Sequence, residues 1–273
     1  MPTTVSFLKM MVPPFFQEAY KLARSPRAYL EEMNWHRLRR MPRNVSTTLR
    51  AAGRRLAVCD GPSAAKTAEE FFGRRQPLQF TSDRADPVIY DVGSNVGITV
   101  LYWKQLYPRS RVVAFEPDPH VFDFLVRNCG AIPNVTLNNV AVWTSDGEMQ
   151  FHPTGADGGC LSKFTADGNS TPTFPVKTIR FRDVLDEPID LLKMDIEGAE
   201  IDVLSDCADR LSNVKRLFVE CHSFDHEEQR FDELMRVLRH AGFRVHIENG
   251  EQDRKSTRLN SSHEWISRMP SSA

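Results

Sequence analysis

From Pro87 onward, short apolar runs alternate with helical patterns, and this alternation constrains the fold more than any other feature of the chain. The runs that predict strands are residues 88–92, 111–116, 135–142, 189–194, 214–221 and 243–247. The helical patterns between them cover residues 98–107, 121–128, 199–211 and 227–241. Strands that alternate with helices predict an α/β fold, here a Rossmann-like, doubly wound parallel sheet with helices on both faces.

The residues before this α/β domain, 1–86, predict a basic N-terminal helical arm and linker. They hold 15 Lys and Arg against 8 Asp and Glu. Residues 15–42 have a helical pattern, whereas residues 43–86 keep no sustained period and predict helix fragments and linker. The apolar face expected for the helical part consists of Phe16, Tyr20, Ala23, Leu30 and Met33.

Two further segments are predicted to lie outside regular structure. Residues 152–175 are rich in Gly, Asp, Ser and Thr, which predicts a loop at the rim of the sheet. Residues 251–273 end the chain, and from 254 they are rich in Ser and Arg without an apolar period. They look like the translation of ligated adapter DNA, so we expect a non-native, disordered tail after an α/β domain of residues 87–250.

Composition limits the partners. The net charge of −1 lacks the basic field of a general nucleic-acid binder, so no nucleic acid is expected. Five scattered cysteines without a CxxC spacing indicate neither a disulfide framework nor a zinc site, and they favour a reducing, cytoplasmic location. No transmembrane segment of about 20 apolar residues occurs. Three roles stay open for the basic arm: a targeting segment, a peripheral membrane contact and a helix that docks on the rest of the protein.

The first predicted strand runs into a glycine turn at residues 91–97 that opens a helix, which is the entrance of a Rossmann-like nucleotide site. The glycines Gly93 and Gly97 are spaced G-x-x-x-G and not G-x-G-x-x-G. Asp91 would repel the pyrophosphate of a dinucleotide, but it would attract a ligand that carries an ammonium and a sulfonium. The turn therefore favours S-adenosylmethionine as the cofactor.

Acidic residues and a histidine follow the later strands, at the edge where open α/β sheets bind ligands. Glu116 ends the second strand and is expected to accept the ribose hydroxyls, with a helix cap as its alternative. Asp195 ends the 189–194 strand, next to Lys193, Glu197 and Glu200, of which the last two also suit a helix N-terminus.

His222 ends the 214–221 strand, either as a general base or as a structural histidine. A metal held by Asp195, Glu197 and His222 is chemically feasible, but no ligand spacing indicates one, so no metal is predicted.

Four segments, in order, resemble the motifs of the FkbM-type S-adenosylmethionine-dependent methyltransferases over residues 87–248. They are Asp-Val-Gly-Ser-Asn-Val-Gly at 91–97, Phe-Glu-Pro at 115–117, Asn-Val-Ala-Val at 139–142 and Lys-Met-Asp-Ile-Glu-Gly-Ala-Glu at 193–200. The resemblance implies a seven-stranded class I methyltransferase sheet and methyl transfer mainly to oxygen. Such a sheet closes with a hairpin, of which only residues 243–247 are recognisable, so the sequence leaves open whether the last strand is missing.

By position, the resemblance implies that the 91–97 loop holds the methionine portion of the cofactor through Asp91, Gly93, Asn95 and Gly97. It implies that Glu116 holds the ribose, and that Asp195 faces the transferred methyl group. Asn139 and Ala141 are the residues implied for the adenine.

The predicted function is O-methylation of a hydroxyl on a sugar or other glycan acceptor, a polyketide or another small metabolite. Either Asp195 or His222 serves as the catalytic base in this prediction. The alternatives are a Rossmann-like NAD-dependent oxidoreductase and a non-catalytic binding protein that retains the fold.

Overall fold

The computed structural model describes residues 25–73, 80–153, 159–161, 172–222, 230–247 and 262–267. The chain divides into two compact units, Met1–Gln76 and Pro77–Ala273. The division precedes the sequence-based boundary at residue 87 because the segment before Pro87 packs into the second unit. Phe80 is buried there against the rings of Trp103 and Tyr107, and the Tyr107 hydroxyl accepts a 2.7 Å hydrogen bond from the Ser82 amide.

The first unit combines helices with a β-hairpin. Its elements are α3 (Pro26–Leu38), β1 (Thr47–Ala51), β2 (Arg54–Val58) and α4 (Gly61–Phe72). The apolar face predicted for the helical part is wrong within α3, because Leu30 and Met33 are 50% and 48% exposed. Trp35 and Leu38 are buried instead, and the Trp35 indole donates to the Arg50 carbonyl at 2.7 Å.

The β1–β2 hairpin lies where the sequence predicted only helix fragments and linker. Its turn residues Ala52 and Gly53 both have positive φ, as in the two-residue turns that suit the twist of a hairpin. Leu49 pairs with Leu56, and both are buried. Each strand contributes only five residues and is rich in arginine, so the alternation of apolar and polar positions is too short to stand out.

The second unit contains a seven-stranded sheet in the order β12-β13-β11-β10-β3-β4-β5. The strands are β3 (Val88–Val92), β4 (Arg111–Phe115), β5 (Val135–Asn138), β10 (Leu191–Met194), β11 (Arg216–Cys221), β12 (Arg244–Ile247) and β13 (Ser262–Ser267). The five strands β11, β10, β3, β4 and β5 run parallel, and β13 is antiparallel to both of its neighbours. The predicted α/β fold class is confirmed.

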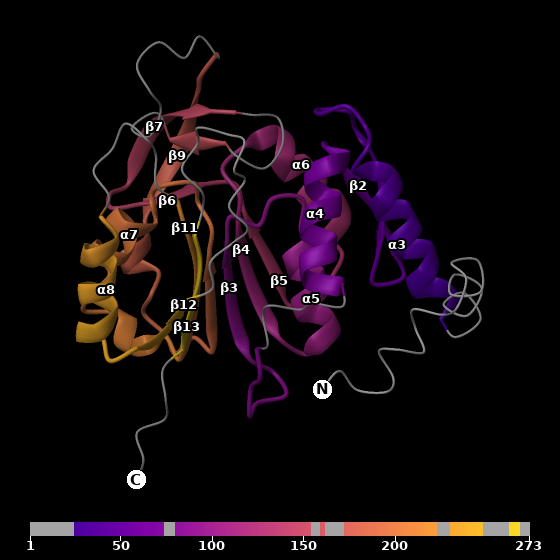
Figure 1. Ribbon diagram of the computed structural model, residues 1–273. Coiled ribbons are helices and arrows are strands. Elements are labelled where there is room, and N and C mark those ends of the chain that lie inside the picture. Colours follow the sequence, from indigo (N-terminus) through magenta and orange to yellow (C-terminus); the bar gives the residue numbers. More distant parts are fainter. Residues whose placement is uncertain are drawn as a thin grey trace, which may run out of the picture. The chain divides into compact units, whose positions relative to one another are not determined.

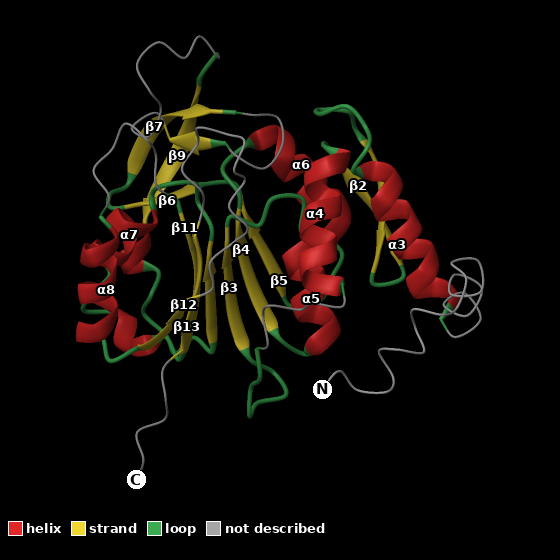
Figure 2. Cartoon of the chain, viewed as in Figure 1, coloured by secondary structure: helices red, strands yellow, loops and turns green. Residues whose placement is uncertain are grey.

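Helices cover both faces of this sheet, with α5 (Ile98–Leu106) and α6 (Pro119–Cys129) on one side and α7 (Glu200–Asp206) and α8 (Phe231–His240) on the other (Figures 1 and 2). All five residues of β3 are buried, as expected for a central parallel strand covered on both faces. Among the described residues, no helix combines the length and the apolar character that crossing a bilayer requires.

The strand order reverses between β3 and β10. From β3 the chain continues through β4 to β5 on one side, and β10 and β11 lie on the other. Ligands of open α/β sheets bind at such a switch point, outside the carboxyl ends of the strands. The candidate site is therefore expected where β3 and β10 end, after Val92 and Met194.

A second, four-stranded sheet follows β5, in the order β6-β9-β7-β8. Its strands are β6 (Ala141–Trp143), β7 (Gly147–His152), β8 (Cys160–Leu161) and β9 (Phe174–Arg180). The predicted 135–142 strand is thus split into β5 and β6, and β8 lies inside the predicted 152–175 loop. Residues 154–158 and 162–171 of that loop lie outside the described residues. The Asn139 side chain, which donates to two backbone carbonyls, marks the split.

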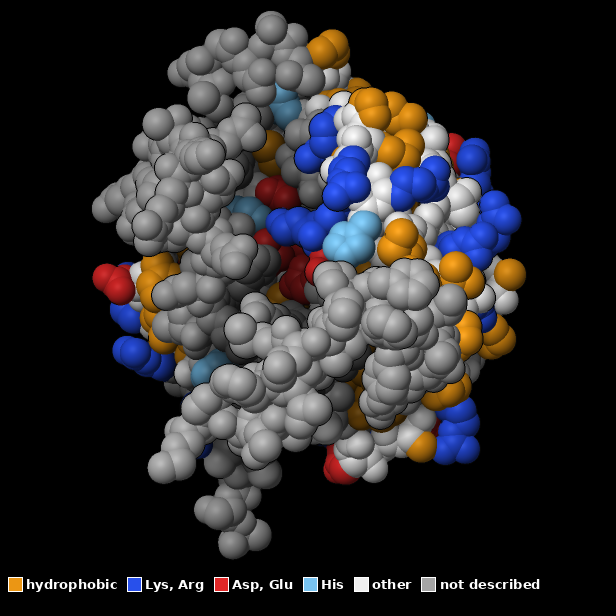
Figure 3. Space-filling model, turned by 45° about the vertical axis from the view of Figure 1, so that its right-hand side comes forward, with side chains coloured by type: hydrophobic (Ala, Val, Ile, Leu, Met, Phe, Trp, Pro, Cys, Tyr) orange, Lys and Arg blue, Asp and Glu red, His pale blue; other side chains and the backbone are white. Residues whose placement is uncertain are grey.

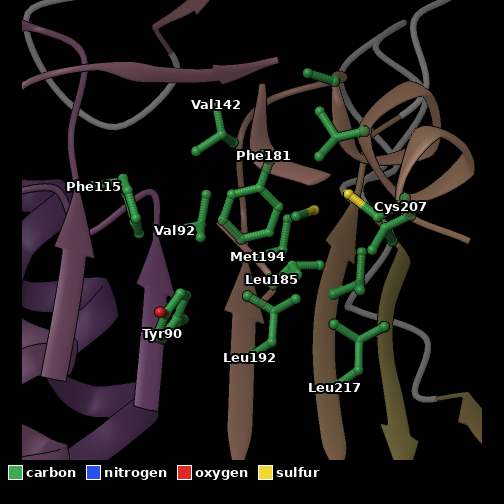
Figure 4. Packing of buried hydrophobic residues seen from close by; sticks show 14 of the residues in the cluster. Tyr90, Val92, Phe115, Val142, Phe181, Leu185, Leu192, Met194, Cys207 and Leu217 are labelled. Carbon is green, nitrogen blue, oxygen red and sulfur yellow. The ribbon is translucent and has the colours of Figure 1, made fainter. Parts of the chain in front are cut away.

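The core joins the two sheets of the second unit. Phe181, from the 3₁₀ helix η2 (Phe181–Asp183), is fully buried and lies between Val92 and Met194 at the ends of β3 and β10 (Figure 4). Its ring meets the Phe115 ring edge-on, with centroids 5.9 Å apart. Val142 of β6 belongs to the same cluster. This apolar packing sets the second sheet beside the carboxyl ends of the parallel strands.

The structure has a strand at residues 262–267, within the segment for which the sequence predicted a disordered tail and left the last strand of the sheet open. They form β13, which pairs with β11 on one side and β12 on the other. Without β13, the backbone N–H and C=O groups along both neighbouring strands would lose their partners. Backbone pairing needs no apolar period, so the pattern of the tail gave no sign of it. The non-native origin of the tail stays a prediction.

Deleting residues 254–273 removes β13 and separates β11 from β12. We expect the free energy of unfolding to fall by more than the roughly 0.5 kcal/mol of an ordinary surface change. Urea denaturation of the shortened chain measures this loss, with a deletion of residues 268–273 as the control that keeps β13. Equal stability of all three chains would exclude β13 from the working fold.

Candidate active site

The loop of residues 91–97 joins β3 to α5, and its two glycines are required by the backbone. Gly93 and Gly97 have φ values of +80° and +91°. A Cβ on Gly93 would overlap the carbonyl oxygen of Asp195, and one on Gly97 would lie 2.6 Å from the Cys129 sulfur. Within the described chain, the atoms that approach these glycines belong to the β10 end and to α6.

Asp91 lies inside the sheet. It is fully buried, accepts a 3.1 Å hydrogen bond from the Trp103 indole, and has the Lys193 ammonium 3.8 Å from its other oxygen. Burial raises the pKa of Asp91, while Lys193 opposes the shift. Asp91 thus supports the loop from within the fold, and its predicted contact with the cofactor stays a prediction.

Glu116 ties the end of β4 to the loop. One of its carboxylate oxygens accepts from the Asn95 amide at 2.9 Å and the other from the Asp118 amide at 3.0 Å. Burial raises its pKa to about 7. Because a carboxylate has about four lone-pair sites, two backbone donors leave room for two hydroxyls.

The two residues implied for the adenine have different surroundings. Asn139 is exposed, and its amide donates to the carbonyls of Glu116 and Pro117 at 2.9 and 3.1 Å. Ala141 is buried in β6 and belongs to the core. Asn139 therefore fixes the chain next to Glu116, and an adenine contact of either residue is untested.

Lys193 and Asp195 meet the loop at the end of β10. The Lys193 ammonium donates to the Gly93 carbonyl at 2.7 Å and to the Asp195 carboxylate at 3.3 Å. Burial acts to lower the pKa of Lys193, but the neighbouring Asp195 and Asp91 outweigh it and raise that pKa. The Asp195 side chain is 29% exposed, and burial raises its pKa against the opposing charge of Lys193. A carboxylate accessible to ligand thus lies beside the glycine loop.

The turn after Asp195 places two more carboxylates. Glu197 has φ +55°, a strained value for a residue with a side chain, and burial raises its pKa to about 8. Glu200 is fully buried and accepts hydrogen bonds from the amides of Ile196 and Gly198, each at 3.0 Å. The helix-start role considered for Glu200 agrees with these contacts, because the bonds hold the turn that begins α7.

His222 follows β11 and lies between these carboxylates. Its Nδ1 is 3.2 Å from Glu200, and its Nε2 is 3.4 Å from Glu197 and 3.7 Å from Glu220. Burial acts against a charged ring, but Glu197 and Glu200 outweigh it and raise the pKa of His222 well above its ordinary value. These carboxylates therefore favour the charged form of the His222 ring.

The structure brings Asp195 and His222 together, as the sequence predicted, and it adds Lys193, Glu197, Glu200 and Glu220 to their surroundings. The first three of these stood out in the sequence as charges that crowd one strand end. Glu220 gave no signal of its own, because a single acid inside a strand pattern does not reveal which side chains it will meet. Acidic side chains lie beside basic and histidine side chains among the described residues (Figure 3).

A divalent cation could be held at this cluster. Ligand atoms of Asp195, Glu200 and His222 lie within 4.8 Å of one another. Carboxylate oxygens and imidazole nitrogens are suitable ligands for such ions. The set differs from the one considered in the sequence by containing Glu200 in place of Glu197. Since Glu200 already accepts from two amides, a cation would compete with the bonds that hold the turn.

Comparisons of the chain with a family model and with known proteins agree on one family. Residues 91–245 match the family model of the methyltransferase FkbM domain. The chain is 30% identical over 157 residues to the 2-O-methyltransferase NoeI of Sinorhizobium fredii, covering 50% of this chain and 64% of that protein. It is 29% identical over 143 residues to the hexuronic acid methyltransferase AglP of Haloferax volcanii, covering 50% and 57%. The chain thus spans less than two thirds of either relative.

A solved structure, the methyltransferase FkbM from Methylobacillus flagellatus, aligns with a TM-score of 0.49 at 15% identity. The alignment covers 71% of this chain and 46% of that one.

Replacing Gly93 by alanine tests the packing of the loop on β10. We expect Gly93→Ala to lower the free energy of unfolding by at least about 2 kcal/mol, since it combines an unfavourable positive φ with an overlap against the Asp195 carbonyl. Gly147→Ala is the matched control, because Gly147 also has a positive φ but its nearest neighbour would lie 3.8 Å away. Urea denaturation compares them, and equal losses would contradict the overlap.

Proposed function

The chain belongs to the methyltransferase FkbM domain family, and we propose that it moves the methyl group of S-adenosylmethionine to a hydroxyl oxygen of a small molecule. The observation that carries this proposal is the contact between the glycine loop and Asp195. It puts a carboxylate that is accessible to ligand next to the cofactor loop at the switch point of the sheet.

The residues around the loop fit this cofactor. Glu116 is positioned to accept both ribose hydroxyls, and Asp91, Glu116 and Asp195 give the loop a negative surrounding. A ligand with an ammonium and a sulfonium gains from this charge, whereas the diphosphate of NAD would be repelled. The charges therefore favour a methyltransferase over an oxidoreductase.

S-adenosylmethionine, when bound, supplies an electrophilic methyl group on a positively charged sulfur. The protein must align the acceptor oxygen with that methyl group and remove the hydroxyl proton. Alignment alone is worth about 7 to 11 kcal/mol of the barrier in favourable cases. Asp195 accepts the proton in this proposal, because it is a carboxylate with a raised pKa at the ligand edge.

His222 has a different role in the proposed mechanism. The raised pKa of His222 favours its charged form, and an imidazolium has no free lone pair with which to accept the proton of the acceptor hydroxyl. Its charge offsets the carboxylates of Glu197, Glu200 and Asp195, and its contacts orient the first two. The structure therefore favours Asp195 over His222 as the base, a choice that the sequence left open.

We propose a sugar as the acceptor, with a polyketide or another small metabolite as the alternative. The names of two relatives, a 2-O-methyltransferase and a hexuronic acid methyltransferase, support a carbohydrate hydroxyl. A hexuronic acid is the probe that follows from this proposal. A protein that binds the cofactor without transferring a methyl group to any such probe would be the non-catalytic alternative.

Glu116→Ala should weaken the binding of S-adenosylhomocysteine by about 1.5 to 3 kcal/mol, because hydrogen bonds to a charged group are lost. Isothermal titration calorimetry measures the affinity, and Glu148→Ala, at an exposed position of β7, is the control. NAD should not compete for the site. An unchanged affinity in Glu116→Ala would remove the ribose role from Glu116.

The affinity for S-adenosylhomocysteine should also rise between pH 6 and pH 8. The pKa of Glu116 in the free protein is about 7, so the carboxylate that accepts the hydroxyls forms above this pH. Glu116→Gln has no such proton to lose, and its affinity should be nearly flat over the same range. A slope that persists in Glu116→Gln would assign the pH dependence to another group.

Asp195→Asn should lower turnover by about 10² to 10⁴ while S-adenosylhomocysteine affinity changes little. His222→Gln should cost less than Asp195→Asn and should not create or remove a pH-rate limb near 6.5, since the pKa of His222 lies well above that value. Glucuronic acid serves as the methyl acceptor in these assays. A parallel assay with EDTA, which removes divalent cations, tests whether turnover requires such a cation. Greater loss in His222→Gln would reverse the two roles.

A further inference from the structure

Lys193 is a buried lysine at the switch point of the sheet. Lys193 is only 3% exposed. In the register of the strands, it lies beside Asp91 of β3 and Phe218 of β11. An ammonium group removed from water is costly unless it is paired and hydrogen-bonded. The contacts of Lys193 must therefore offset this cost.

Those contacts join the two halves of the candidate site. The ammonium donates to the carbonyl of Gly93, which is the first glycine of the cofactor loop, at 2.7 Å. It lies 3.3 Å from the carboxylate of Asp195 and 3.8 Å from that of Asp91. A lysine ammonium has three donors and no acceptor. Two hydrogen bonds go to the Gly93 carbonyl and the Asp195 carboxylate, whereas Asp91 contributes its charge from beyond hydrogen-bond distance.

The backbone leaves little freedom around these contacts. The Asp195 amide donates to the Val92 carbonyl at 3.1 Å, and Gly93 packs directly on the Asp195 carbonyl. The position of the Asp195 backbone is thus set by β3, but its side chain still has rotamers to choose from. The Lys193 ammonium is placed to select the rotamer in which the carboxylate stays beside the loop.

We propose that Lys193 is a positioning residue for methyl transfer, which holds the Asp195 carboxylate at a fixed place relative to the cofactor loop. The proposal rests on the proposed function, in which Asp195 accepts the acceptor proton. Misplacing a catalytic group by about 1 Å costs on the order of 10² in rate. Lys193 therefore acts on turnover through Asp195 and not through contact with the reacting atoms.

A double-mutant cycle tests this route of action. We expect Lys193→Met to lower kcat by about 10- to 100-fold with the KM for glucuronic acid changed less than about threefold. In the Asp195→Asn background, where no carboxylate is left to position, Lys193→Met should lower kcat by less than about threefold. Lys193→Arg keeps the charge and donors, and it should recover part of the activity. Equal losses in both backgrounds would overturn the proposal.

Lys104→Met provides the matched control. Lys104 also donates to a backbone carbonyl, that of Ser110 at 2.7 Å, but it lies on α5 and outside the site. Its effect on kcat should be the same in the presence and absence of the Asp195→Asn change. A coupling of Lys104 to Asp195 as large as that of Lys193 would show a general loss of packing and would contradict a positioning role.

Urea denaturation of the same wild-type, single-mutant and double-mutant proteins tests the Lys193–Asp195 contact without any methyl acceptor. Lys193→Met should shift the unfolding midpoint less in the Asp195→Asn background than in the wild type, because the Asp195 carboxylate is then no longer there to lose its partner. Additive shifts would overturn the Lys193–Asp195 tie. If instead the shifts are coupled but the wild type binds no S-adenosylhomocysteine, the tie stands and the proposed function fails.

Discussion

The backbone contact between Gly93 and Asp195 fixes the geometry on which the whole site depends. The strand β3 must end in a loop, and β10 must end beside it, because the two strands pair in parallel up to Val92 and Met194. Only a residue without a Cβ permits the loop to pass over the Asp195 carbonyl. The glycine loop and the backbone of Asp195 are therefore packed against each other, and the Asp195 side chain starts from a fixed place beside the loop.

The charges around this contact are incompletely balanced. Asp195, Glu197, Glu200 and Glu220 gather near His222, and Lys193 brings a second cation into the same region. Burial raises the pKa of Glu116 to about 7 and that of Glu197 to about 8. Such shifts mean that the folded protein holds carboxylates in places where their ionised forms are poorly solvated. In the proposed function, a positively charged ligand relieves this cost, which is the reason for proposing S-adenosylmethionine as the cofactor.

Local signals in the sequence found the elements that carry the site. The strands β3, β4, β10 and β11 are short, mainly apolar runs, as buried parallel strands are. Glu116, Asp195 and His222 directly follow the last three of them. The β1–β2 hairpin, the second sheet and β13 were missed, because their strands are short or depend on partners far away in the chain. A pattern of period two needs several residues to be visible, and β8 has only two.

The sequence by itself determined the fold class, the glycine loop and the placement of Glu116, Asp195 and His222 at strand ends, because each of these depends on neighbours within a few residues. Only the tertiary structure decided which charges meet. Lys193 reaches Gly93 across 100 positions of the chain, and His222 meets Glu200 across 22. Charge interactions depend on distance and burial, which are properties of packing. The direction in which the pKa of His222 shifts, on which the proposal of Asp195 as the base draws, therefore depends on the fold.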